Sequence, residues 1–251
     1  MEHFALASEV YGVGLIFARV GAILMLIPGV GEAGVPPRIR LALALVLSFV
    51  IYATIRSTLP APPAALDGLV GQIIVEVIIG LALGSIIKLF MGTLAVTGET
   101  VALQTTLAFS QTTNPLEAQP GSTVTAFLSI LGVALIFSTN LHQLFIGAVV
   151  HSFTVFAPGR APPTGDIVSL AVRTTGETFA LGVQLAAPVL VFSLVINVAI
   201  GLIGRILPSF QIFFAATPMI LLLGLAVFAM ALGMAGLVWI DRYRAFTSQL
   251  I

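Results

Sequence analysis

Six long apolar segments dominate this chain and leave few ways for it to fold. They cover residues 10–28, 41–55, 68–97, 123–156, 167–204 and 212–240. A helix that spans a membrane needs about 20 mostly apolar residues, and most of the segments approach or exceed that length. Only 8% of the residues are charged, against about 25% in soluble domains. The chain cannot cover a soluble globule with polar groups, and we expect an integral membrane protein.

The segments also predict the fold class. None carries the alternating pattern that marks a strand, and turn-forming residues gather between them, as at residues 29–37 and 158–163. We expect an all-α integral membrane protein in which residues 1–251 form one membrane-embedded domain. Residues 98–122 are rich in Thr, Gln and Gly and predict a polar or re-entrant loop between two helices. Pro188 is expected to interrupt the fifth segment.

The arginines conflict with six simple crossings. Arg38 and Arg40 place the first loop in the cytoplasm, and Arg242 and Arg244 place the C-terminus there as well. This arrangement requires an odd number of crossings, whereas six segments give an even number. Either one long segment is a hairpin, or the helices do not all span the bilayer.

Several classes of chemistry lack the residues they need. The formal net charge is 0, there are no cysteines and Lys88 is the sole lysine, which argues against nucleic-acid binding and thiolate chemistry. No glycine-rich phosphate loop precedes Lys88, and no Gly-x-Ser-x-Gly elbow occurs. His142 and His151 lack the spacing of metal ligands on a helix. We expect no catalytic residues, no metal and no cofactor.

Ionisable residues inside the apolar segments allow two interpretations. Each costs about 2.5–3.5 kcal/mol at the centre of a membrane helix, so such groups usually face protein or water. They could line a proton or substrate path, or they could form buried ion pairs and helix-end anchors, which we favour. The residues are Arg19, Glu76, Lys88, Arg173, Glu177 and Arg205.

The third segment contains a row of polar residues and glycines at four-residue spacing. The row consists of Gln72, Glu76, Gly80, Gly84, Lys88 and Gly92. Because a helix has about 3.6 residues per turn, such a row winds slowly around it as a groove. Gly80 and Gly84 have the spacing that lets another helix approach closely. We expect a partner helix to cross this groove.

Residues 107–115 contain one aromatic side chain, Phe109, among small polar residues. They form either an ordinary surface loop or a loop that folds back into a pore, with Phe109 as a hydrophobic obstruction. The residues of this candidate gate loop are Phe109, Ser110, Gln111, Thr112, Asn114 and Pro115.

Taken together, the motifs of this chain resemble those of the FliR family of flagellar export-gate proteins, whose relatives in virulence secretion are SpaR and YscT. The similarity extends in order over nearly the whole chain. Its motifs are ARVG at 18–21, PGVG at 28–31, VPPRIRL at 35–41, EVIIGL at 76–81, GE at 98–99, NLH at 140–142, Pro188, NVAIG at 197–201, Arg205, Pro208, Phe213 and Pro218.

The resemblance implies a subunit that forms helical hairpins within an export gate, together with FliP-like and FliQ-like subunits and near FlhB-like and FlhA-like proteins. The gate would sit in the bacterial inner membrane at the flagellar basal body and pass unfolded proteins. The core loop at about residues 106–115 would help to close it, and Thr112 stands where the family often has a second Phe. Arg205 and Pro208, with Glu76, Gly80, Gly84 and Lys88, are expected to serve packing or partner contacts.

Three alternatives remain open. A secondary transporter would also use broken helices and membrane carboxylates, but we find no inverted repeat. A membrane enzyme is not specified by any motif, and a virulence-type gate subunit is possible within the same family.

Overall fold

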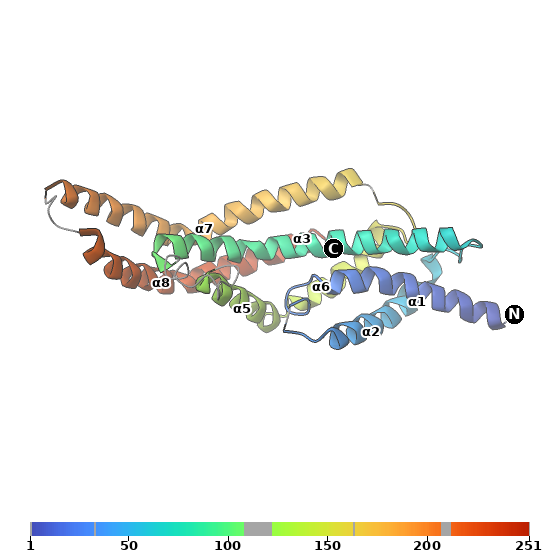
Figure 1. The fold of residues 1–251 in the computed structure, drawn as a ribbon. Coiled ribbons are helices and arrows are strands. Elements are labelled where there is room, and N and C mark those ends of the chain that lie inside the picture. The colour runs from blue at the N-terminus through green and yellow to red at the C-terminus, as the bar shows by residue number, and fades with distance from the viewer. Residues whose placement is uncertain (1, 33, 108–121, 163, 207–211, 251) are drawn as a thin grey trace. The chain divides into compact units, whose positions relative to one another are not determined.

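The computed structural model describes residues 2–32, 34–107, 122–162, 164–206 and 212–250, and all of its regular structure over these ranges is helical (Figure 1). This confirms the all-α fold class. The helices are α1 (Glu2–Leu24), α2 (Pro37–Ile55), the short 3-10 helix η1 (Arg56–Thr58), α3 (Leu66–Gln104), α5 (Thr123–Ser138), α6 (His142–Val155), α7 (Thr164–Ile206) and α8 (Ile212–Ser248).

Five of the helices, α1, α2, α3, α7 and α8, are long and apolar enough to cross a membrane, or six spans result if α5 and α6 count together as one. The predicted multi-pass membrane architecture is therefore confirmed by length and composition. The predicted segments 41–55, 68–97, 167–204 and 212–240 lie within α2, α3, α7 and α8. The first segment was predicted too long, because α1 ends at Leu24 and not near residue 28.

Two sequence-based expectations of breaks were wrong. The loop predicted to begin at residue 98 begins later, because α3 continues to Gln104. The hydroxyl groups of Thr97 and Thr100 donate to the carbonyls of Thr93 and Val96 at 2.8 and 2.7 Å, so polar residues are satisfied within the helix. Pro188 lies inside α7 without ending it. The lost hydrogen bond and the ring's clash with the preceding turn are tolerated here, because the buried neighbours Ala186 and Val189 hold the helix in place.

The fourth apolar segment is broken where no break was predicted. It forms α5 and α6, and Asn140 between them has a left-handed backbone with φ 58°. Asparagine adopts this conformation more readily than most residues. The sequence NLH thus marks a helix boundary inside a segment that looks continuous by hydropathy.

The chain divides into two compact units. Unit 1 comprises Met1–Phe90, Thr139–Thr174 and Arg244–Ile251. In it α1 and α2 pack as an antiparallel hairpin, and buried aliphatic side chains of α1, α3 and α6 form the core, among them Ile16, Val20, Ile79 and Val149.

Unit 2 comprises Met91–Ser138 and Thr175–Tyr243. Its core contains Val101 of α3, Ile136 of α5, Ala186 of α7 and Trp239 of α8, each at most 1% exposed. The ring of Trp239 stacks on that of Tyr243, with centroids 5.0 Å apart. Whether the whole chain acts as one domain stays a prediction.

Candidate functional site

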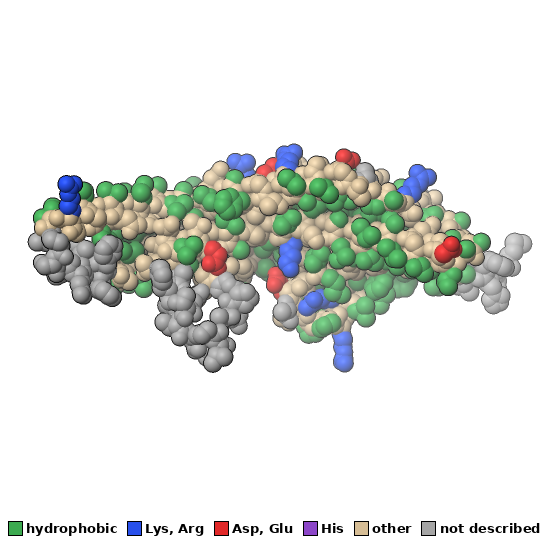
Figure 2. Space-filling model, turned by 45° about the horizontal axis from the view of Figure 1, so that its top comes forward, with side chains coloured by type: hydrophobic (Ala, Val, Ile, Leu, Met, Phe, Trp, Pro, Cys, Tyr) green, Lys and Arg blue, Asp and Glu red, His purple; other side chains and the backbone are tan. Residues whose placement is uncertain are grey.

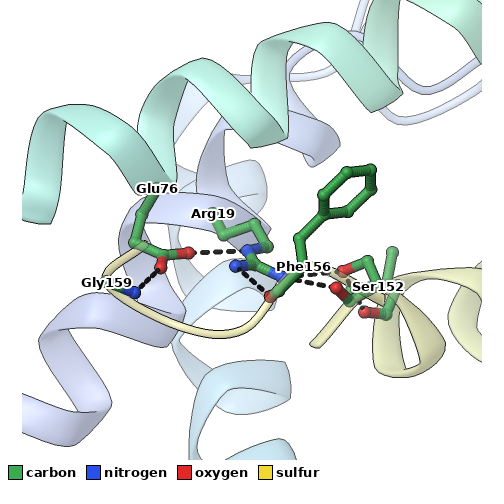
Figure 3. A network of polar contacts seen from close by, with 6 residues as sticks. Arg19, Glu76, Ser152, Phe156 and Gly159 are labelled. Carbon is green, nitrogen blue, oxygen red and sulfur yellow. Dashed lines mark hydrogen bonds and ion pairs between the residues drawn. The ribbon is translucent and has the colours of Figure 1, made fainter. Parts of the chain in front are cut away.

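Unit 1 contains a fully buried ion pair, Arg19 with Glu76 (Figure 3). Arg19 of α1 and Glu76 of α3 are both 0% exposed, and Arg19 Nε donates to Glu76 Oε2 at 2.6 Å. The remaining donors of Arg19 reach α6 and its C-terminal end. Nη1 donates to the Ser152 carbonyl at 2.7 Å, and Nη2 donates to the Phe156 carbonyl at 2.9 Å.

The acidic partner also reaches the segment that follows α6. Glu76 Oε1 accepts a hydrogen bond from the backbone N–H of Gly159 at 2.7 Å. Gly159 has φ 74°, a conformation that favours glycine. An added Cβ there would lie 3.3 Å from Pro60 and from the Gln72 side chain. Arg19 and Glu76 therefore both bind the segment that follows α6: Arg19 donates to the Phe156 carbonyl, and Glu76 accepts from the Gly159 N–H.

The surroundings explain why a charged pair is tolerated here. A buried ion pair is stable only when its remaining hydrogen-bonding groups also find partners. Backbone carbonyls take two donors of Arg19, and its guanidinium carbon lies 4.1 Å from the centroid of the Phe153 ring, within range of a cation–π interaction. The arrangement fixes α1, α3 and the end of α6 relative to one another, and it leaves no acid or base exposed for chemistry.

The predicted row on α3 separates into parts with different roles. Gln72 accepts a hydrogen bond from the Tyr11 hydroxyl, whereas Lys88 is exposed. The helix that occupies the glycine face is α1 of the same chain. An added Cβ would lie 2.5 Å from the Arg19 carbonyl oxygen at Gly80 and 3.2 Å from the Ile23 carbonyl oxygen at Gly84. Contact of this row with another subunit stays a prediction.

A second polar cluster lies in unit 2, where α3 meets the start of α5. Glu99 Oε1 accepts hydrogen bonds from the Ser122 backbone N–H at 2.6 Å and from the Thr125 hydroxyl at 3.1 Å. The Ser122 hydroxyl in turn accepts from the Thr125 backbone N–H at 3.1 Å, which caps the first turn of α5.

The remaining predicted site residues are outside these clusters. Arg205 is exposed in the last turn of α7. The candidate gate residues Phe109, Ser110, Gln111, Thr112, Asn114 and Pro115, together with Pro208, lie outside the described residues. Within the described part of the chain, no group of three or more His, Asp or Glu residues could hold a metal ion.

Sequence reasoning marked Arg19 and Glu76 as intramembrane charges but did not pair them. They are 57 residues apart, and no local spacing connects them. It missed Ser152, Phe156 and Gly159, because backbone groups supply most of these contacts and leave no signature in side-chain pattern.

Comparisons with known proteins find the same family of proteins over nearly the whole chain. The model of the family described as bacterial export proteins, family 1, matches residues 10–246. The chain is 49% identical over 244 residues to the flagellar biosynthetic protein FliR of Caulobacter vibrioides, covering 97% of both chains. It is 26% identical to FliR of Escherichia coli, covering 84% of this chain and 80% of that one. It is 25% identical to FliR of Aquifex aeolicus, with coverage of 92% and 89%.

Proposed function

The chain belongs to the bacterial export proteins, family 1, and from this membership we propose that it is a FliR-type subunit of the flagellar type III protein export gate. With FliP-like and FliQ-like subunits it forms the channel through which unfolded flagellar proteins cross the bacterial inner membrane. FlhB-like and FlhA-like proteins are its further neighbours at the basal body. Its role is structural and gating, without catalysis.

The observation that supports this proposal is the length over which apolar side chains are exposed. On α3, Leu66 is 78% exposed and Leu103 is 59% exposed. They are about 55 Å apart along the helix at about 1.5 Å per residue. On α7, Val168 and Ile206 are 60% and 76% exposed, and about 57 Å of helix, measured along its length, lies between them.

Lipid alone does not cover such a length. The hydrocarbon core is about 30 Å thick, and a helix tilted by 40° crosses about 40 Å of it. Apolar side chains beyond that distance need protein as their cover. Figure 2 illustrates the same property on one face, where hydrophobic side chains are widespread and charged ones are isolated. Neighbouring subunits of an export gate supply this cover.

The transporter alternative receives no support from Glu76, which is 0% exposed and paired with Arg19, so its carboxylate serves packing and does not line an open path. The flagellar names of the relatives favour a flagellar gate over a virulence-type gate.

The gate itself is assigned to the segment around Phe109. A channel wide enough for an unfolded chain needs a seal at rest, and a hydrophobic constriction can provide it by dewetting. Deletion of residues 109–113 is expected to raise the sensitivity of cells to sodium or small solutes at equal levels of assembled complex. Cells with Phe109→Ala are expected to show a weaker leak than cells with the deletion, because side chains of partner subunits share the seal. Equal low permeability in the deletion and the wild type would mean that the segment is only a connector.

The assembly is tested by purification from native membranes in mild detergent, with the partners identified by mass spectrometry. We expect co-purification with FliP-like and FliQ-like proteins. Recovery of the chain alone, from cells in which those proteins are expressed, would contradict the proposed function.

A further inference from the structure

Glu99 of α3 makes hydrogen bonds to the start of α5, outside the buried ion pair of unit 1. Its carboxylate lies at the N-terminus of α5, where one oxygen accepts both the Ser122 N–H and the Thr125 hydroxyl. A negative charge is favourable at a helix N-terminus, where backbone N–H groups are unpaired. Glu99 thus connects α3 to the first turn of α5 through a residue that is 23 positions away from Ser122.

Neighbouring residues bring the two helices into close contact at the same place. An added Cβ at Gly98 would lie 2.5 Å from Thr125 Cα, so only glycine permits this approach. The Ser122 hydroxyl lies 3.4 Å from the Gly98 carbonyl oxygen, and the Thr125 hydroxyl lies 3.4 Å from that of Ala95. The junction therefore combines a carboxylate contact, two hydroxyl contacts and a glycine, all within unit 2.

The end of α3 follows shortly after this junction. The Thr105 hydroxyl donates to the Val101 carbonyl at 2.9 Å, and Thr106 has a left-handed backbone with φ 63°. The helix therefore stops within two turns of Glu99. The place where the chain leaves α3 and the place where it enters α5 are both fixed relative to Glu99.

We propose that Glu99 is a positioning residue for export: it fixes the start of α5 against the end of α3, and so sets where the connection between them is anchored. The functional part rests on the proposed role as an export-gate subunit. The anchoring part concerns described residues only and can be tested without export.

The anchoring is measured by the distance between spin labels in the purified complex. The chain has no cysteines, so labels can be placed at Leu103→Cys on α3 and Phe127→Cys on α5, two positions that are 59% and 48% exposed. We expect a narrow distance distribution with Glu99 present. Glu99→Ala should add a second, longer component, because loss of a hydrogen bond to a charged group favours the detached state by roughly 10- to 100-fold.

Two matched variants isolate the contact. Glu99→Gln keeps an acceptor oxygen and should retain most of the narrow component. Ser122→Pro removes the N–H that donates to Glu99, whereas Ser122→Ala keeps it, so the proline variant alone should reproduce the Glu99→Ala distribution. The exposed Glu9 provides a control, since Glu9→Ala removes a carboxylate far along the sequence from this junction and should leave the distribution unchanged.

Export and leakage are then measured on the same variants at equal assembly. We expect Glu99→Ala and Ser122→Pro to raise solute sensitivity or reduce secretion, with Glu99→Gln close to wild type. An unchanged distance distribution in both Glu99→Ala and Ser122→Pro would overturn the anchoring. A broadened distribution with unchanged leakage and secretion would overturn the functional role. Failure of the proposed function itself would appear separately, as loss of partner co-purification in the wild type.

Discussion

Unit 1 and unit 2 satisfy their polar groups in different ways. In unit 1, Arg19 and Glu76 are 0% exposed and form an ion pair. The two side chains also make hydrogen bonds to backbone groups of α6 and of the segment after it. In unit 2, hydroxyl and amide groups make several contacts between helices, such as Thr97 with the Gly182 carbonyl at 3.1 Å and Ser193 with Gln104 at 2.5 Å. The carboxylate of Glu99 adds a contact between α3 and the start of α5, where its partners are a backbone N–H and a hydroxyl. A charged pair of this kind is costly to break, whereas single hydroxyl contacts are individually weak.

The difference extends to their surfaces. The membrane-length window of α8 is 6% buried within the chain, whereas that of α1 is 39% buried. Helix α1, which belongs to unit 1, is therefore covered by its own chain to a greater extent than α8 is. Most of α8 belongs to unit 2, and it presents apolar side chains such as Met230 and Leu222, 77% and 70% exposed. The contrast between α1 and α8 shows that the chain covers some of its apolar helices itself and leaves others, α8 above all, for its surroundings.

The largest effect is expected when the buried pair is broken on one side. Arg19→Leu leaves the Glu76 carboxylate buried without its cation, which costs about 3–5 kcal/mol. Thermal unfolding of the detergent-solubilised protein should detect a large drop in the midpoint. Arg19→Leu combined with Glu76→Leu should recover part of the loss, because no lone charge remains. A single variant as stable as the wild type would refute the role of the pair.

A smaller effect is expected at the close-approach glycines. Gly80→Ala places a Cβ against the backbone of α1 and should destabilise unit 1 by about 1–3 kcal/mol. Gly71→Ala on the same helix has nothing within 4 Å and should be neutral or stabilising by about 0.5–1 kcal/mol. Gly84→Leu should likewise weaken the packing of α1 and, through it, assembly. The comparison fails if Gly80→Ala and Gly71→Ala unfold at the same temperature.

Glycine-to-alanine substitutions in unit 2 allow the packing of the two units to be compared. Gly182→Ala in unit 2 would bring a Cβ to 2.6 Å from Val96 Cβ, a side-chain atom, and to 3.0 Å from the Thr93 carbonyl oxygen, whereas Gly201 is open. Val96 Cβ is fixed to the backbone of α3, so Gly182→Ala should also destabilise the protein. We expect it to cost somewhat less than Gly80→Ala, because the nearest backbone atom is 3.0 Å from the added Cβ at Gly182 and 2.5 Å from it at Gly80. Unfolding midpoints of these two variants and of Gly201→Ala test the order.

The smallest effect is expected at Arg205. It is exposed in the last turn of α7, where a positive charge contributes about 0.3–1 kcal/mol with the helix dipole. Arg205→Lys keeps the charge and should retain motility. Arg205→Leu should reduce assembly, measured on native gels. A fully assembled Arg205→Lys complex that does not export would indicate a direct role in transport.

The sequence was sufficient for the all-α membrane fold because long apolar segments without strand alternation predict membrane-length helices directly. It was insufficient where a long-range contact decides the outcome. Arg19 and Glu76 could be flagged as buried charges, but their pairing depends on how α1 packs on α3. The break at Asn140 was missed because Leu141 and Phe145 keep the segment apolar. Residues 98–104 were misread as a loop because threonine hydroxyls can return to their own helix, a property that composition does not reveal.

The central claim is that protein, and not lipid alone, covers the exposed helices of unit 2. A photoreactive amino acid placed at Leu222 or Met230 in cells tests it directly, with exposed Val46 of α2 as the comparison site in unit 1. We predict that irradiation of intact membranes yields protein adducts containing FliP-like or FliQ-like partners at Leu222 or Met230, in higher yield than at Val46. Adducts with lipid only at both unit 2 sites, in cells that assemble flagella, would contradict the account.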